Sequence, residues 1–493
     1  MKRNRKTALA LSLGLVLGAA TSAFAQPTIN LTLKDAIKMA FEKNLDLKVE
    51  LYNPAMAEAD IRRNLGIYDP LLALGINYER SNSSNILTFK PQPVDQVTAN
   101  AGVSQLLPTG TVVGVTAQSG WISNSAKYYS NSVDLTLQQP LLKGFGQETT
   151  ELAINVSRFT KGETMNVFRT RLSDTVAKVR NDYFQLYNLL EALEVRRTSL
   201  ELAKRILQND QGRVKAGVLP AYELLNSEFQ VATREKQVID AERAVRDQMD
   251  VLRVDLQLPS STEIVLADQP FRGSYNLSEQ KALDDALGYR PELNTQRDVI
   301  KINDLQQRVA KTQTLPDLTL NASVGTGGFD RRFLRGMEKT ATIDEPSWGV
   351  GLQFSYPLGN RAAENDYIRK KLVLEQAQTQ LQNLESGVVR DVKAALRLVA
   401  ASYTQLDVTA RGRAYAEDRL RAFQKRHDVG LATTKDVFDV ENDLVAAKGN
   451  QIQAVVDYNN SITQLWRATG EILDQEGISV TDTDADHLYQ KMK

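Results

Sequence analysis

The sequence Leu31-Thr32-Leu33-Lys34-Asp35-Ala36-Ile37-Lys38-Met39-Ala40 returns in altered form as Leu277-Ser278-Glu279-Gln280-Lys281-Ala282-Leu283-Asp284-Asp285-Ala286, 246 residues later. The same offset relates further anchors: Leu47 and Leu293, Pro70 and Pro316, Leu72 and Leu318, Leu74 and Leu320. A repeated sequence indicates one architecture built twice. We therefore predict a first structural repeat over residues 26–270, a second over 271–470, and a C-terminal tail over 471–493.

The first 25 residues have the pattern of a secretory signal peptide. A basic start over residues 2–6 precedes an apolar run from Ala8 to Ala20 and the small-x-small motif Ala23-Phe24-Ala25. The apolar run is too short for a membrane-spanning helix. We expect cleavage before Gln26 and export of the mature chain.

Composition excludes several classes of protein. The chain has 60 basic and 60 acidic residues, and loss of the signal peptide leaves a net charge near −4, which does not suggest a nucleic-acid-binding protein. It has no cysteine, so disulfides and thiolate metal sites are excluded, and we predict neither metal nor cofactor. No later apolar run approaches the length of a membrane-spanning helix.

Alternating apolar and polar residues predict six strands. Leu72, Leu74 and Ile76 alternate with small or polar residues, and the same pattern recurs in other runs. The six runs lie near 70–80, 95–106, 111–119, 131–139, 317–325 and 347–356. Strands of a soluble sandwich also alternate in this way, but Asn, Gln, Ser and Gly on the polar side suit an outer-membrane barrel better.

Long helical segments fill the rest of each repeat. We predict a helix over 33–64 with a kink at Pro54, its counterpart over 278–313, and hairpin helices over about 151–215 and 361–428. Each hairpin helix can reach about 100 Å. One apolar seam steps by three and four residues, from Val176 to Leu200, and another follows an eleven-residue period from Leu384 to Leu406. A dimeric coiled coil would explain the helices but not the strands.

These features together resemble the TolC-type outer membrane efflux proteins over nearly all of the mature chain. The motifs that carry the resemblance are Leu31-Thr32-Leu33 through Asn44, Tyr68-Asp69-Pro70, Gln139-Pro140-Leu141-Leu142-Lys143-Gly144-Phe145-Gly146, Tyr356-Pro357-Leu358-Gly359-Asn360, Val429-Gly430-Leu431 and Asp436-Val437-Phe438-Asp439-Val440-Glu441. The resemblance implies a mixed α and β membrane protein, a homotrimer whose strands form one outer-membrane barrel and whose helices form a periplasmic helical barrel.

The resemblance also implies a function that is transport rather than catalysis. The family provides the exit duct of tripartite efflux pumps or type I secretion systems. Its implied partners are outer-membrane lipid, a periplasmic adaptor protein and an inner-membrane transporter of RND or ABC type. The exported substrate cannot be read from this sequence.

The resemblance assigns roles to residues near the hairpin tips. The adaptor-docking tips are Ala216, Gly217, Val218, Val429, Gly430 and Leu431, and the carboxylates of the periplasmic aperture are Asp436, Asp439 and Glu223. Without the resemblance, these three acidic residues would be interpreted as charges that stabilise helix N-termini. The family's locking Tyr and Arg correspond to His427 and Ala432 here, so the lock must differ; Arg426, Lys435 and Arg213 are the candidate substitutes.

Two alternatives belong to other classes. An enzyme is disfavoured because His427 and His487, the only histidines, have no ligand spacing, and no nucleophile motif or phosphate loop is present. A periplasmic coiled-coil scaffold would lack the barrel.

Within the family, the number of barrel strands stays open: all six runs span the membrane, or the two middle runs form a separate hairpin. In the six-strand version, the turn Pro108-Thr109-Gly110 faces the periplasm.

Overall fold

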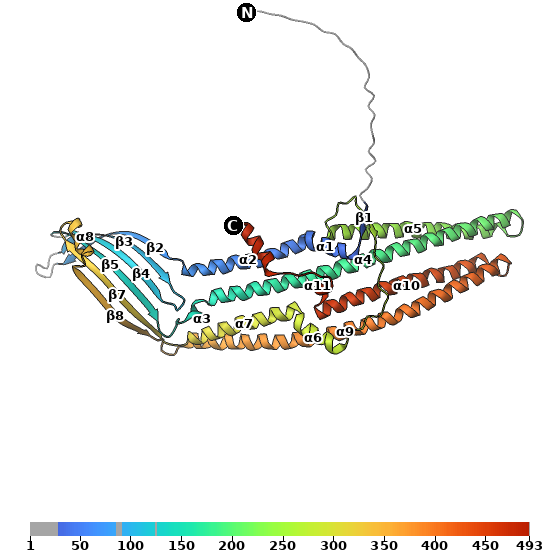
Figure 1. Ribbon diagram of the computed structural model, residues 1–493. Coiled ribbons are helices and arrows are strands. Elements are labelled where there is room, and N and C mark those ends of the chain that lie inside the picture. The colour runs from blue at the N-terminus through green and yellow to red at the C-terminus, as the bar shows by residue number, and fades with distance from the viewer. Residues whose placement is uncertain (1–27, 85–90, 124–125, 493) are drawn as a thin grey trace, which may run out of the picture.

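A computed structural model describes residues 28–84, 91–123 and 126–492 of the chain. The molecule is elongated, with a β-sheet at one end and two long helical hairpins whose tips lie at the other end (Figure 1). The predicted signal peptide lies outside the described residues.

The six predicted strands form one antiparallel sheet in the order β2-β3-β4-β5-β7-β8. The strands are β2 (Leu71–Ser84), β3 (Pro91–Leu106), β4 (Val112–Ser123), β5 (Lys127–Pro140), β7 (Asp317–Asp330) and β8 (Glu345–Ser355). The first repeat contributes four strands and the second contributes two, and β5 pairs with β7 to join them. Strands β2 and β8 are the two edges of the sheet.

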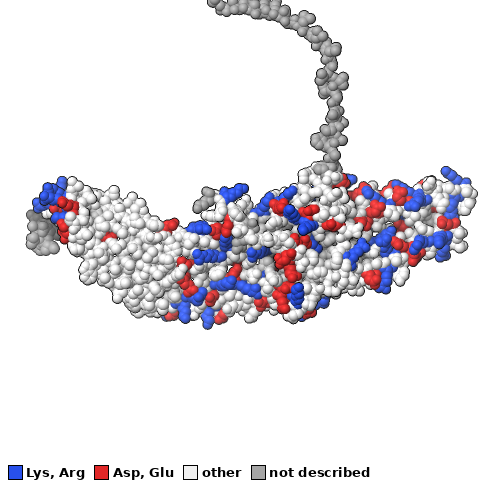
Figure 2. All heavy atoms as spheres, in the orientation of Figure 1, with Lys and Arg blue, Asp and Glu red and all other residues white. Residues whose placement is uncertain are grey.

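The two faces of the sheet differ in chemistry. The register places Leu74 opposite Ala101, and Ala101 opposite Ala117, so the apolar residues of successive strands share one face. On this face Ile76 is 83% exposed and Trp348 is 80% exposed. Figure 2 shows most of the sheet as a nearly uncharged surface, between the charged helices and a charged outer end. The opposite face carries small and polar residues, so the sheet has the two-sided chemistry of a membrane barrel.

The turn at Pro108-Thr109-Gly110 lies at the end of the sheet from which the helices emerge. The Gly146 amide, at the start of the helical region, donates to the Thr109 carbonyl at 3.1 Å, and the Gln105 side chain donates to the Tyr68 carbonyl at 3.0 Å. The middle strands are therefore full members of the sheet and not a separate hairpin, in agreement with the six-strand version.

The helices repeat in the same order in both halves of the chain. In the first half they are α1 (Leu33–Lys43), α2 (Leu45–Leu65), the 3₁₀ helix η1 (Gly66–Tyr68), α3 (Gln147–Thr150), α4 (Leu152–Lys215) and α5 (Ala221–Asp255). In the second half they are α6 (Glu279–Tyr289), α7 (Pro291–Thr312), α8 (Phe333–Ala341), α9 (Arg361–Asp428), α10 (Thr434–Thr469), α11 (Ile472–Gln475) and α12 (Asp482–Met492).

The prediction of one unbroken helix at the start of each repeat was wrong. The first helix breaks at Asn44, whose side chain accepts from the amides of Asp46 and Leu47 and so caps α2. The second breaks at Arg290, because a residue before proline disfavours the helical conformation and Pro291 begins α7. The two breaks are related by the same offset of 246 residues. Pro54 lies inside α2.

A short parallel β-pair near the middle of the molecule was not predicted. Strands β1 (Thr28–Leu31) and β6 (Glu263–Leu266) pair along their full lengths. The buried Tyr183 hydroxyl, on α4, donates to the Leu31 carbonyl at 3.1 Å. This pair attaches the start of the described chain to the largest hydrophobic cluster, which α4 dominates.

The apolar seam of α4 packs against helices of the second half of the chain, and the seam of α9 packs within that half. Val176, Val179 and Tyr183 of the predicted α4 seam are buried, and so are Val388 and Val392 of the α9 seam.

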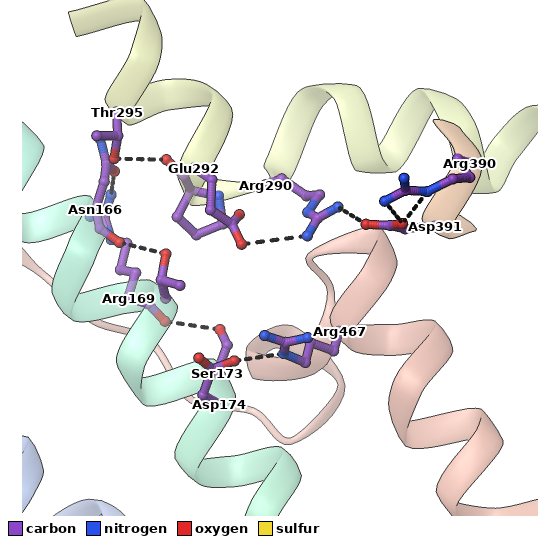
Figure 3. Close-up of polar contacts among 12 residues, drawn as sticks. Asn166, Arg169, Ser173, Asp174, Arg290, Glu292, Thr295, Arg390, Asp391 and Arg467 are labelled. Atoms are coloured by element: carbon purple, nitrogen blue, oxygen red, sulfur yellow. Dashed lines mark hydrogen bonds and ion pairs between the residues drawn. The ribbon is translucent and has the colours of Figure 1, made fainter. Parts of the chain in front are cut away.

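Figure 3 shows polar links between the repeats and within the second one. Arg467 on α10 binds Asp174 on α4 at 2.6 Å, and Arg290 at the α6–α7 break lies 3.9 Å from Asp391 on α9. Residues separated by almost 300 positions therefore hold the helices side by side.

The C-terminal segment folds back onto the helices over its described residues, 471–492. Ala485 of α12 is fully buried, and Asp486 forms an ion pair with Lys161 of α4 at 2.5 Å. Glu476 forms a buried ion pair with Arg180. Over the described residues, no helix is both long and apolar enough to cross a membrane.

Candidate functional site at the hairpin tips

The two hairpin tips have the same backbone geometry. Gly217 and Gly430 adopt φ of 75° and 77°, a left-handed conformation that strains other residues. In the first tip the Val218 amide donates to the Arg213 carbonyl at 2.9 Å, and in the second the Leu431 amide donates to the Arg426 carbonyl at 2.7 Å. Both turns are therefore glycine-capped helix ends of the same type.

The predicted docking residues lie on exposed surface. Val218, Val429 and Leu431 are each more than two-thirds exposed, and Ala216, Gly217 and Gly430 are exposed beside them. Apolar side chains that stay uncovered in a single chain often mark a contact with another molecule.

Asp436 takes part in a capping box at the start of α10. Its carboxylate accepts from the Thr433 amide at 2.8 Å, and the Thr433 hydroxyl accepts from the Asp436 amide at 3.1 Å. The hydrogen bonds from the Thr433 hydroxyl and amide lower the pKa of the Asp436 carboxyl, since they favour its charged form. The helix-terminal role considered in the sequence analysis is thus present, and it leaves the carboxylate charged.

Asp439 and Glu223 have different local partners. Asp439 forms an exposed ion pair with Lys435 at 2.6 Å, and Glu223 accepts from the Asn226 side chain at 3.1 Å. Lys435 therefore offsets one of the two negative charges of Asp436 and Asp439. A ring built from three chains would hold a net charge near −3 from these three residues, not the −6 of the carboxylates alone.

A buried polar cluster that the sequence analysis did not find connects the two hairpins. Asp210 of α4 is fully buried, and its carboxylate accepts from Ser227 of α5 at 2.6 Å and from Thr434 of α10 at 3.2 Å. His427 of α9 places Nε2 at 3.2 Å from the Thr434 hydroxyl and 3.3 Å from Arg213 Nη1. We call Asp210, Arg213, Ser227, His427 and Thr434 the tip cluster.

The tautomer of His427 selects which contact of Nε2 is a hydrogen bond. A protonated Nε2 donates to Thr434, whose hydroxyl donates in turn to Asp210. An unprotonated Nε2 accepts from Arg213. Either arrangement links the first hairpin to the second.

Of the three residues named as substitutes for the family's lock, only Arg213 reaches the other hairpin. Arg426 donates to the Leu431 carbonyl of its own turn at 3.4 Å, and Lys435 binds Asp439 on its own helix.

A second buried cluster lies further from the tips. Arg234 of α5 forms an ion pair with Glu441 of α10, and both side chains are 3% exposed. Ser199 of α4 donates to Glu441 and accepts from Arg234 Nε at 3.1 Å. The Arg234 guanidinium also lies 4.8 Å from the centre of the Phe438 ring. Breaking one member of such a pair costs about 3–5 kcal/mol, so this cluster strongly couples the hairpins.

The tips show no grouping typical of a metal site. Over the part of the chain that the structure describes, no three His, Asp or Glu side chains converge as metal ligands.

Comparisons with known proteins agree with this architecture. The family described as outer membrane efflux protein matches residues 282–471. The outer membrane protein TolC of Salmonella enteritidis is 24% identical over 398 residues, covering 78% of each chain. The outer membrane efflux protein BepC of Brucella suis is 22% identical over 366 residues, covering 74% of this chain and 77% of its own.

Solved structures share the fold. The CmeC outer membrane channel of Campylobacter jejuni superposes with a TM-score of 0.65 at 16% identity, over 93% of this chain and 89% of that one. The fold, the sheet and the hairpins define an outer-membrane channel with periplasmic helices, and not an enzyme. More narrowly, residues 282–471 match the outer membrane efflux protein family, and about three-quarters of the chain is similar to TolC and BepC.

Proposed function

We propose that three copies of this chain form the exit duct of a tripartite efflux pump or a type I secretion system. The observation that carries the proposal is a sheet with one apolar exposed face and two unpaired edges, continued by long helices. An unpaired edge pairs readily with another strand, and closure into a barrel removes all edges. Three sheets of six strands would close eighteen strands, a size that leaves an aqueous channel.

Exposed apolar residues along the helices support assembly. Ile239 and Val254 of α5 are 66% and 67% exposed, and Tyr415 of α9 is 70% exposed. These residues lie away from the tips, along the lengths of the helices. Neighbouring subunits would cover them and complete a helical barrel in the periplasm.

The tips provide the proposed entrance. Val218, Val429 and Leu431 with their neighbouring glycines would dock a periplasmic adaptor, which connects the duct to an inner-membrane transporter of RND or ABC type. Asp436, Asp439 and Glu223 would line the aperture and hold a negative potential there, which favours cations over anions.

Planar-bilayer conductance tests the proposal. The purified protein should form channels that a trivalent cation, hexamminecobalt(III), blocks from the helical side. The double variant Asp436→Asn/Asp439→Asn should weaken the block by at least about tenfold, since each tenfold step is about 1.4 kcal/mol of ion binding. Asparagine is preferred to alanine because its oxygen can still accept the Thr433 hydrogen bonds that begin α10.

Asp457→Asn is the matched control. Asp457 is exposed on the same helix but lies 21 residues further from the tip, roughly 30 Å along the axis. Equal block of the wild type and the double variant would show that the two acids serve the helix start alone. Absence of any channel would refute the duct itself.

A further inference from the structure

Helix α8 covers the outer end of the sheet on its apolar face. Thr340 of α8 donates to the Asn131 carbonyl at 3.3 Å, and the Phe333 ring meets the Tyr129 ring edge-on at 5.7 Å. A Cβ added at Gly328 of β7 would collide with the Gly336 carbonyl of α8, so the helix lies directly on the strand. The sequence analysis did not predict α8.

An apolar groove opens between α8 and the strands. It has a volume of about 740 Å³, which lies within the range of ligand-binding pockets. Leu74, Ile76, Ala99 and Ala101 form its floor, and Phe333 and Met337 form its wall. Since these residues lie on the apolar face, the groove opens towards the membrane and not towards the polar interior.

Basic side chains lie on and next to α8, the helix that borders the groove. Arg332 and Arg335 are exposed, and no described carboxylate lies within ion-pair distance of either guanidinium, although the Arg332 amide donates to Asp330 at 2.9 Å and the charge of Arg335 acts on the same carboxylate. Lys339 is already held by Asp330 at 3.5 Å, and Arg331 stacks at 5.7 Å over Tyr128, which points to the opposite face of the sheet. Figure 2 shows basic and acidic side chains together at the outer end of an otherwise nearly uncharged sheet.

We infer that this groove binds an acyl chain of a phosphorylated glycolipid of the outer leaflet, the class that includes lipid A, with Arg332 and Arg335 on its phosphates. The inference rests on the proposed function in one respect, that the apolar face of the sheet faces lipid. A guanidinium presents paired donors that match a phosphate. A short helix with apolar residues on one side and exposed arginines on the other suits the boundary between acyl chains and headgroups.

Charge and shape together favour this occupant. A neutral lipid would fill the groove but leave Arg332 without an anionic partner and Arg335 with only Asp330, which Lys339 already binds. A neighbouring subunit would bring two acidic residues to this end, Asp344 and Glu345, at the outer end of β8, the edge strand that would meet β2. Crosslinking from Met337 separates that occupant from a lipid.

Native mass spectrometry of the full-length protein in detergent tests the site. Diphosphoryl lipid A should bind the wild type more tightly than phosphatidylethanolamine does. Arg332→Ala/Arg335→Ala should weaken lipid A binding by at least about tenfold, the scale expected for two charges at an anionic lipid surface. Arg331→Ala, on the opposite face at the same end, should leave it unchanged. Equal binding of both lipids, or an unchanged double variant, would overturn the inference.

A second measurement identifies the occupant in the membrane. A photo-crosslinking amino acid at Met337 should attach lipid A in isolated outer membranes. Attachment to a neighbouring subunit instead would overturn the inference and assign the groove to the subunit interface. The proposed duct has a separate test: it would be refuted if the wild-type protein formed neither trimers nor conducting channels.

Discussion

Replacing Thr434 by valine should loosen the contact between the two hairpins. The substitution keeps the shape of this buried side chain and removes only its hydroxyl. That hydroxyl donates to Asp210 at 3.2 Å and lies 3.2 Å from His427 Nε2. It is thus the atom through which α10 contacts the buried carboxylate of α4.

The expected loss of stability follows from the hydrogen bond between the Thr434 hydroxyl and the Asp210 carboxylate. A hydrogen bond to a charged group contributes about 1.5–3 kcal/mol, and the long distance places this one near the lower limit. About 1.5 kcal/mol corresponds to roughly a tenfold change in an equilibrium constant. The Arg234–Glu441 ion pair remains intact, so the hairpins should separate more often but not fully.

Single-channel recording measures the result as open probability. Thr434→Val should raise it about tenfold, on the scale of one such hydrogen bond. Ser227→Ala is the control, because Ser227 binds the same carboxylate from α5 within the first hairpin. If Thr434→Val changes open probability no more than Ser227→Ala does, the tip cluster does not hold the hairpins together.

Three further outcomes follow from the fold. Because the chain has no cysteine, Thr109→Cys gives one labelling site, and an impermeant maleimide should reach it only after the outer membrane is permeabilised; labelling in intact cells would contradict a periplasmic turn. The lowered pKa of Asp436 means that its contribution to the start of α10 is present above the unfolded pKa near 3.8 and is lost as pH falls through the lower folded value. Amide protection factors at the α10 N-terminus, corrected for the intrinsic exchange rate at each pH, should therefore fall below pH 3.8 in the wild type and show no such step in Asp436→Asn. Gly430→Ala should destabilise the second tip by about 1 kcal/mol because of its positive φ, whereas Gly449→Ala, inside α10 with open space around it, should not; equal thermal stability of the two variants would refute this.

Periodic features were predictable from the sequence. The hairpin helices predicted over about 151–215 and 361–428 are observed at Leu152–Lys215 and Arg361–Asp428. Long segments without proline and with few glycines, whose apolar residues recur every three or four positions, favour a continuous helix. The strands were also found, because alternation between a lipid face and a polar face repeats in each of them.

Features set by single residues were missed. The break at Asn44 depends on one side chain that caps a helix, and the same residue type is tolerated within helices. Strand β1 has only four residues, and its partner β6 lies more than 230 residues away, so neither has a detectable period. Helix α8 lies between two predicted strands, in a segment for which the sequence analysis made no prediction.

The tip cluster was missed for a different reason. Asp210 and His427 are 217 positions apart, and nothing local shows that they meet. One signal was available: His427 is one of two histidines in the chain and occupies the position of a locking residue in the family. Its burial, 5% exposed, required the packing of four helices.

Cross-linking of the two sheet edges tests the central claim most directly. Single cysteines at β2 positions Leu72, Leu74 and Ile76 would be combined with single cysteines at β8 positions Trp348, Val350 and Leu352, in all nine pairs. Within one chain these edges lie on opposite sides of a six-stranded sheet, so a disulfide must join neighbouring subunits. The account predicts that at least one pair converts the outer-membrane protein into a covalent trimer on a denaturing gel. Monomers in every pair, or a series of species larger than a trimer, would contradict the closed three-subunit barrel.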